Sequence, residues 1–248
     1  MVDDLKEFTK RAKDVLVNVT VTGRMKHLYF LNVNEQEILE SMVKKYDAVD
    51  VIFDGGFSSP ERRRAVVMPT YISPEAVDSR ITLFKIDIIG SGEVTHSQVL
   101  GSLMSLDIDR DVIGDITVDE QGAYFTACNE FDAFLTENFT KVSRHDIRLI
   151  VQEEPVEREV HVEEMDIIVS SMRLDVIVKA LIQNSRSKAE EYIDAGFVRH
   201  NHMIEKKVTR ICHIGDILSI RKYGRFKIVE NKKTTKSGKH VLVVSKSI

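Results

Sequence analysis

Cationic and hydroxyl side chains gather in one stretch of the sequence, residues 171–225, and together they could bind phosphate. Residues 185–188 read Ser-Arg-Ser-Lys at the start of an expected helix, where free backbone N–H groups and cations point toward the same anion. A solvated helix start can have the same composition, so the inference rests on the whole set. The side chains that we predict to contact RNA are Arg173, Arg186, Ser187, Lys188, Arg199, Asn201, Lys206, Lys207, Arg221, Lys222 and Arg225.

Two short helices are expected to position the first of these side chains. In the first helix, apolar residues from Leu174 to Leu181 follow the i, i+3, i+4, i+7 spacing of one buried face, and Ser171 is the expected N-cap. The second helix has two possible starts: Ser185 could cap it, or Ser187 could, because residues 187–190 fit a capping box. Short strands at 197–198, 203–204 and 217–221 then complete the stretch.

Residues 1–75 are expected to form an N-terminal α+β region. Apolar spacing predicts helices over 3–17 and 34–46, with Asn34 as the N-cap of the second. Strands are expected at 49–53 and 65–68, on either side of a glycine turn. The three arginines at 62–64 could contact phosphate or could be the solvated end of a hairpin, and strand alternation puts Arg63 on the face opposite its neighbours.

The pattern of apolar and turn residues over 76–164 predicts elements in the order β-α-β-β-α-β. This order is typical of the ferredoxin-like, RNA-recognition-motif-like fold. Helices are expected to be capped by Thr95 and Asn129. Tyr124 and Phe125 are neighbours in an expected central strand, so only one of them can face outward and stack on a base. Because this segment is acidic and lacks an RNA-recognition signature, a spacer or docking role is favoured over direct stacking. Residues 153–164 are interpreted as a linker or an edge strand.

Composition is typical of a soluble, cytoplasmic protein. The 248 residues are 43% hydrophobic and 30% charged, no apolar run reaches membrane-spanning length, and two isolated cysteines suggest a reducing compartment. The net charge of −4 hides an asymmetry. Residues 166–248 contain 17 Lys and Arg against 8 Asp and Glu, whereas residues 1–165 contain 18 against 31. The basic C-terminal part therefore predicts an anionic partner.

Motifs for catalysis or cofactor binding are missing: there is no P-loop, no dinucleotide-binding glycine pattern and no HExxH. The Asp-x-Asp-x-Asp stretch at 107–111 resembles the opening of a calcium loop, but Val112 and Val118 occupy positions that require Gly and Glu. His200 and His202 could bind a metal only with partners that the sequence does not identify. We therefore expect no enzyme activity, no cofactor and no metal site.

The C-terminal motifs resemble the S-four-type (alpha-L) RNA-binding domain, named after a bacterial ribosomal protein. Four short motifs carry the resemblance and occur in the family's order: Ser171-Met172-Arg173-Leu174-Asp175, Ser185-Arg186-Ser187, Gly196-x-Val198-x-x-Asn201 and Gly215-Asp216-x-Leu218-Ser219-Ile220-Arg221. The family usually has Asn-Gly at the hairpin turn, where this sequence has Asn201-His202. Asn and His both tolerate a positive φ angle. The resemblance implies that residues 165–248 form this domain.

The whole layout resembles the YlmH family of bacterial proteins, often encoded beside cell-division genes. Outside the C-terminal motifs, the resemblance rests on Asp-Gly-Gly at 54–56, Glu-Arg at 61–62, Leu-Gly-Ser-Leu at 100–103 and Ile-Gly-Asp-Ile at 113–116. It implies a non-catalytic factor that binds rRNA or tRNA on the large ribosomal subunit carrying peptidyl-tRNA. The implied process is the rescue of stalled translation, or ribosome-associated quality control, with no membrane and no small-molecule substrate.

Residue chemistry by itself supports only a module for structured RNA. An RNA-modifying enzyme or accessory would need a substrate pocket in residues 1–165, and a cell-division role would need a protein-binding surface on the acidic part. Within the RNA-binding interpretation, reversing Arg186 to Glu is expected to abolish ribosome association and to leave the thermal melt nearly unchanged.

Overall fold

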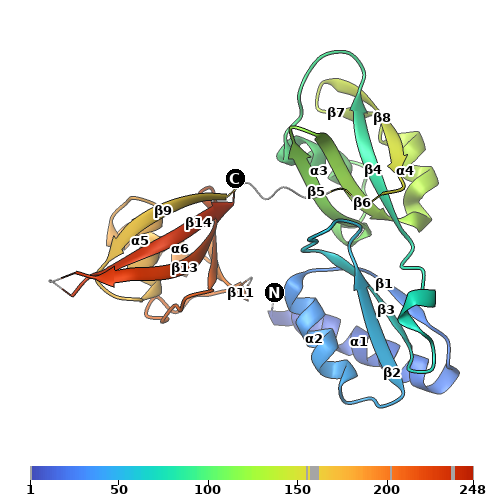
Figure 1. The fold of residues 1–248 in the computed structure, drawn as a ribbon, viewed down its shortest axis with the longest axis horizontal. Coiled ribbons are helices and arrows are strands. Elements are labelled where there is room, and N and C mark those ends of the chain that lie inside the picture. Colours follow the sequence, from blue (N-terminus) through green and yellow to red (C-terminus); the bar gives the residue numbers. More distant parts are fainter. Residues whose placement is uncertain (1, 155, 157–161, 202, 236–237, 248) are drawn as a thin grey trace. The chain divides into compact units, whose positions relative to one another are not determined.

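The computed structural model describes residues 2–154, 156, 162–201, 203–235 and 238–247 (Figure 1). The chain divides into two compact units, Met1–Glu159 and Val160–Ile248. Each unit combines helices with antiparallel sheets, in agreement with the mixed helix and strand content that the sequence predicts. No helix among the described residues is long and apolar enough to cross a membrane.

The first unit begins with two helices that pack on a small antiparallel sheet of strand order β1-β3-β2. Phe8, Ala12, Leu16 and Val19 lie at helical spacing on the first helix and are buried. This apolar face carries the helix beyond the predicted end at residue 17. The strand β1 follows and was not predicted, because only its last two residues are buried. The elements are α1 (Val2–Thr22), β1 (Lys26–Leu31), α2 (Val33–Val43), β2 (Val49–Asp54) and β3 (Arg63–Pro69).

The start of α2 differs from the prediction, which placed the N-cap at Asn34. The N-cap is Asn32, whose side chain accepts a hydrogen bond from the Glu35 backbone N–H while the Glu35 carboxylate accepts one from the Asn32 N–H. Two overlapping Asn-x-x-Glu patterns occur here, and tertiary contacts decide between them. The earlier start buries Gln36, whose amide donates to the backbone carbonyls of Leu31 and Glu61.

A second antiparallel sheet, of strand order β5-β6-β4-β8-β7, completes the first unit. Thr95 caps α3 with a full capping box to Gln98, as predicted. Asn129 does not cap α4; it begins a 3₁₀ turn, and the α-helix starts three residues later at Asp132. The elements are β4 (Ile81–Ile88), α3 (His96–Met104), β5 (Ile113–Asp119), β6 (Gly122–Cys128), α4 (Asp132–Asn138), β7 (Lys141–Val142) and β8 (His145–Gln152).

The neighbouring aromatics of β6 face opposite sides of this sheet, as alternation requires. Phe125 is fully buried and stacks on Phe84, with ring centroids 5.3 Å apart. Tyr124 lies on the other side and is only 6% exposed, because it packs against Phe57 and Leu83. The Tyr124 ring is therefore covered by these neighbours and is not an open platform for a base.

The arginines at 62–64 make contacts within the unit, so they are not the solvated end of a hairpin. Arg62 donates to the Phe30 carbonyl and pairs with Asp111. Arg63 donates to Gln36 and lies over the Phe53 ring, 5.2 Å from its centroid. Arg64 is 1% exposed and pairs with Glu130 at 2.7 Å. These side chains hold the first unit together.

The second unit is an antiparallel sheet of strand order β11-β10-β12-β13-β14-β9, packed against two helices (Figure 1). The strand β9 pairs with the C-terminal strand and was not predicted over its full length; the remaining linker residues 155 and 157–161 lie outside the described residues. The elements are β9 (Val162–Val169), α5 (Leu174–Leu181), α6 (Arg186–Asp194), β10 (Val198–His200), β11 (Met203–Ile204), β12 (Ile217–Ile220), β13 (Gly224–Thr234) and β14 (His240–Ser247).

The two helices of this unit settle the choice of caps. Ser185 caps α6, since its hydroxyl accepts from the Lys188 N–H, and Ser187 lies within the first turn. Ser171 does not cap α5; the residue before the helix is Arg173, which bridges to Ile211 through the backbone. Gly196 follows α6 with a φ of 71°, the left-handed conformation that glycine adopts at helix ends.

Candidate nucleic-acid interface

An open hollow of about 640 Å³ in the second unit brings together part of the predicted set. It lies between the segment that leaves α6 and the turn that joins β12 to β13. Its lining includes the cations Arg199, Arg221, Lys222 and Arg225. The phenyl ring of Phe197 also lines it. Clustered cations beside an exposed aromatic are the side chains that a single-stranded RNA backbone and its bases would contact.

Strand register explains why these residues converge. Arg199 pairs with Ser219 across β10 and β12, and Ser219 pairs with Arg225 across β12 and β13. Residues that are paired across adjacent strands point to the same face. The flanking residues Val198 and Ile220 point the other way and are buried in the core. A row of polar side chains therefore crosses the sheet, and the β12–β13 turn adds Arg221 and Lys222 at one end.

An aromatic group holds one of these cations in place. The guanidinium of Arg221 lies 4.7 Å from the centroid of the Phe197 ring. Phe197 meets the Tyr192 ring edge-on at 5.6 Å, and Tyr192 meets Tyr223 at 5.8 Å. Stacking costs the guanidinium none of its N–H donors, so Arg221 can still bind a phosphate while its position is restricted. Neither Phe197 nor Tyr192 was predicted from the sequence to belong to an RNA surface.

Arg173 and Arg186 are not among the residues described as lining the hollow. Both bind one buried carboxylate, that of Asp175. The Asp175 side chain is 0% exposed. Its oxygens lie 3.0 Å from Arg173 Nε and 2.6 Å from Arg186 Nη2. Arg186 also lies 3.2 Å from Glu190. We therefore no longer expect reversal of Arg186 to spare the thermal melt, because it would place a second carboxylate beside a buried one. Each guanidinium keeps further N–H donors that could reach a phosphate.

Asp175 predicts a pH dependence of stability. Burial acts to raise the pKa of this carboxyl, but hydrogen bonds from Arg173 and Arg186 outweigh burial and hold the pKa below its usual value. A carboxyl whose pKa is lower in the folded state stabilises the fold fully above its unfolded pKa of about 3.9, and this contribution is lost as the pH falls through the folded value. We expect Asp175→Asn to cost about 1–2 kcal/mol near neutral pH, allowing for the exposure of the arginines.

Urea unfolding between pH 3 and pH 7 measures this effect, with pH values chosen around the usual carboxyl pKa of about 4. The difference in unfolding free energy between wild type and Asp175→Asn should shrink as the pH falls. The exposed acid Asp194 offers a control, since Asp194→Asn should change neither the stability nor its pH profile appreciably. A constant difference at every pH would show that Asp175 acts through packing and not through its charge.

The remaining residues that were predicted to contact RNA form two groups: some are exposed, and others make contacts within the second unit. Ser187, Lys206 and Lys207 are exposed, and they do not line the hollow as described. Lys188 pairs with Glu191 at 2.8 Å. Asn201 has a φ of 47° and holds the turn: its amide donates to Asp216 and its oxygen accepts from the Ile217 N–H. The neighbour that was predicted to share this turn, His202, lies outside the described residues.

Comparisons with known proteins show what the chain is similar to. Residues 74–158 match a family described as "Putative RNA-binding domain in YlmH". The chain is 32% identical over 222 residues to a protein of Bacillus subtilis (strain 168) named "Ribosome-associated protein quality control protein P2", which covers 87% of this chain and 85% of that protein. The fold of this chain is similar to that of a solved structure, "Cell division protein ylmH from Streptococcus pneumoniae". The TM-score is 0.53 and the identity 26%, and the match covers 61% of this chain and 92% of the solved chain.

Proposed function

This chain belongs to the YlmH family, and from that premise we propose that it is a non-catalytic factor for structured RNA. It binds rRNA, tRNA or both on the large ribosomal subunit that carries peptidyl-tRNA, in the rescue of stalled translation. The curated relative is named for ribosome-associated quality control, which supports the process and a cytoplasmic location. The observation that carries the RNA-binding part is the row of cations that lines the hollow beside Phe197.

The arrangement of elements supports a division of labour along the chain. The sheet order β5-β6-β4-β8, with α3 and α4, is the order of a ferredoxin-like domain. We propose such a domain for residues 76–164, after an N-terminal region at 1–75. We propose an S-four-type domain for residues 165–248, which the helix pair α5–α6 and the following β10–β12–β13 strands support. The domain at residues 165–248 makes the main phosphate contacts, because residues 166–248 carry the excess of cations.

Salt dependence tests the RNA-binding part. Phosphate contacts release counterions, so the logarithm of the binding constant should fall with the logarithm of salt concentration. With about five to eight phosphates neutralised, the slope should be roughly −4 to −7. Fluorescence anisotropy with labelled fragments of large-subunit rRNA and with tRNA measures this slope. A slope near zero with either RNA would contradict phosphate binding by the cations of the second unit.

A further inference from the structure

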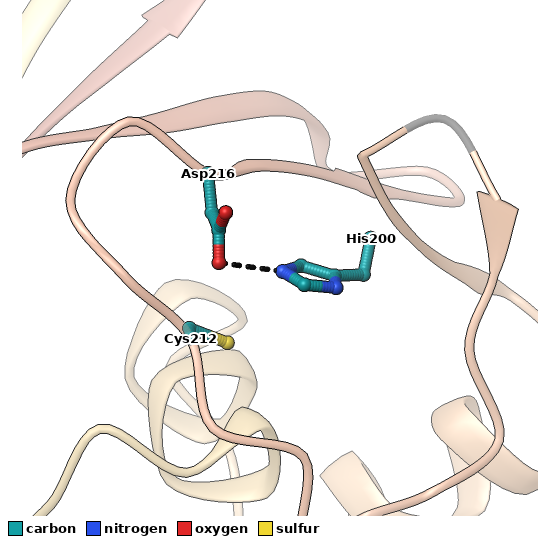
Figure 2. Close-up of side chains that lie close together, drawn as sticks. All are labelled: His200, Cys212 and Asp216. Carbon is teal, nitrogen blue, oxygen red and sulfur yellow. Dashed lines mark hydrogen bonds and ion pairs between the residues drawn. The ribbon is translucent and has the colours of Figure 1, made fainter. Parts of the chain in front are cut away.

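Three side chains with metal-binding atoms converge in the second unit, outside the hollow. His200, Cys212 and Asp216 each offer one donor atom, and these atoms all lie within 4.8 Å of one another. Figure 2 shows the imidazole and the carboxylate facing each other, with the thiol beside them. The distance from His200 Nε2 to Asp216 Oδ2 is 2.6 Å. His200 is 7% exposed and Cys212 is 1% exposed, so the cluster is largely shielded from water.

The backbone fixes the position of each donor. His200 ends β10 and alternates with Arg199, so its side chain points to the inside of the sheet while Arg199 points to the hollow. The N–H of Cys212 donates to the Met172 carbonyl at 2.8 Å, which ties this loop to the segment before α5. Asp216 accepts from the His213 N–H at 2.7 Å. The cluster is thus assembled from two segments, the end of β10 and the loop before β12, which supplies both Cys212 and Asp216.

The donor set suits a cation of the zinc type. Thiolate sulfur and imidazole nitrogen are the ligands that zinc prefers, and a carboxylate oxygen commonly completes the set. Zinc binds sulfur at about 2.3 Å and nitrogen or oxygen at about 2.0–2.2 Å. Donors already within 4.8 Å of one another need only small shifts to reach these distances. The exposed His213 lies beside the cluster, with its Nδ1 3.9 Å from Asp216 Oδ2, and would have to rotate inward to supply a fourth donor.

Metal binding would require the Cys212 thiol to lose its proton, and a divalent cation beside the sulfur supplies the charge that stabilises a thiolate.

We propose that His200, Cys212 and Asp216 form a binding site for a divalent transition metal of the zinc type. Such an ion would join the end of β10 to the loop at 211–216. Since Arg199 is the neighbour of His200, the ion would also hold one wall of the hollow in place. The proposal does not depend on RNA binding, and its test uses metal alone.

Cobalt gives the sharpest test, because Co²⁺ bound to a thiolate has a charge-transfer band that water-ligated Co²⁺ lacks. The full chain, without an affinity tag and treated with chelator, should develop this band on titration with Co²⁺, and Zn²⁺ should abolish it. Cys212→Ser should remove the band and weaken Zn²⁺ binding at least tenfold. The other cysteine is the control: Cys128 is buried in the first unit, and Cys128→Ser should keep the band.

A second measurement needs no variant. Because a ligand of the folded state raises its stability, Zn²⁺ at about 100 times its Kd should raise the melting temperature of the wild type by about 5 °C or more. A charge-transfer band that is absent in the wild type, or that survives in Cys212→Ser, would overturn the proposal. A wild-type melting temperature that Zn²⁺ does not change would overturn it too, even if Cys212→Ser failed to fold.

Discussion

Reversing Arg221 and Lys222 together to Glu is expected to weaken RNA binding by about two orders of magnitude while changing the melting temperature little. Both side chains line the hollow, at the turn between β12 and β13. Losing one charged phosphate contact costs about 1.4 kcal/mol or more, which is tenfold in affinity. Two lost contacts should also make the salt slope less steep by about 2. The stacking of Arg221 on Phe197 is exposed and contributes only about 0.5–1 kcal/mol to stability.

A matched control separates local contacts from net charge. Lys10 and Arg11 are an exposed neighbouring pair on α1 in the first unit, and reversing both to Glu changes the net charge by the same amount. Anisotropy titrations of both double variants at several salt concentrations give affinities and slopes. If the α1 variant loses as much affinity as the Arg221/Lys222 variant, the hollow is not the RNA contact and only the total charge matters.

Replacing Arg64 by Met is expected to destabilise the first unit by about 3 kcal/mol. The Arg64 side chain is 1% exposed and forms a two-pronged ion pair with Glu130, at 2.7 and 2.9 Å. It also donates to the carbonyls of Leu28 and Arg80. The hydrogen bonds from Arg64 hold the pKa of Glu130 below its usual value. Removing one partner of a buried pair costs about 3–5 kcal/mol, and the 40% exposure of Glu130 places the expected cost at the lower end.

Urea unfolding, followed by a probe in each unit, measures this loss and shows which unit it affects. Arg63→Met is the neighbouring control. Arg63 is half-buried, donates one hydrogen bond to Gln36 and lies over the Phe53 ring, so its loss should cost about 1 kcal/mol. RNA binding by the folded Arg64 variant should stay at the wild-type level. A cost for Arg64→Met no larger than that of Arg63→Met would contradict the structural role given to it.

Short-range patterns in the sequence were sufficient to predict those features that depend on residues close together along the chain. The capping box at Thr95, the stop at Gly196 and the succession of strands and helices along residues 81–152, apart from the short β7, follow from short-range spacing and turn residues. Ser185 and Ser187 could not be separated in this way, since both fit a helix start. The choice between Asn32 and Asn34 as the N-cap of α2 likewise depends on contacts across the fold, those of the Gln36 amide with the Leu31 and Glu61 carbonyls.

Pairs that meet across the fold could not be predicted. Arg64 and Glu130 are far apart in the sequence, and nothing in the run of arginines shows which of them is buried. Asp175 offered a signal that could have been used: a carboxylate on the apolar stretch of α5 needs a cation, and arginines precede and follow it. His200, Cys212 and Asp216 come together only through the pairing of β10 with β12.

Binding to the large ribosomal subunit is tested most directly by cosedimentation of the purified chain with separated small and large subunits, with and without peptidyl-tRNA, across a salt series. We predict salt-sensitive binding to the large subunit that peptidyl-tRNA strengthens, and loss of that binding in the Arg221→Glu, Lys222→Glu variant. Failure to sediment with either subunit, while free RNA still binds tightly, would contradict the ribosomal role and favour RNA modification or regulation. Failure to bind any RNA would contradict the RNA-binding function itself and leave a protein partner in cell division as the better hypothesis.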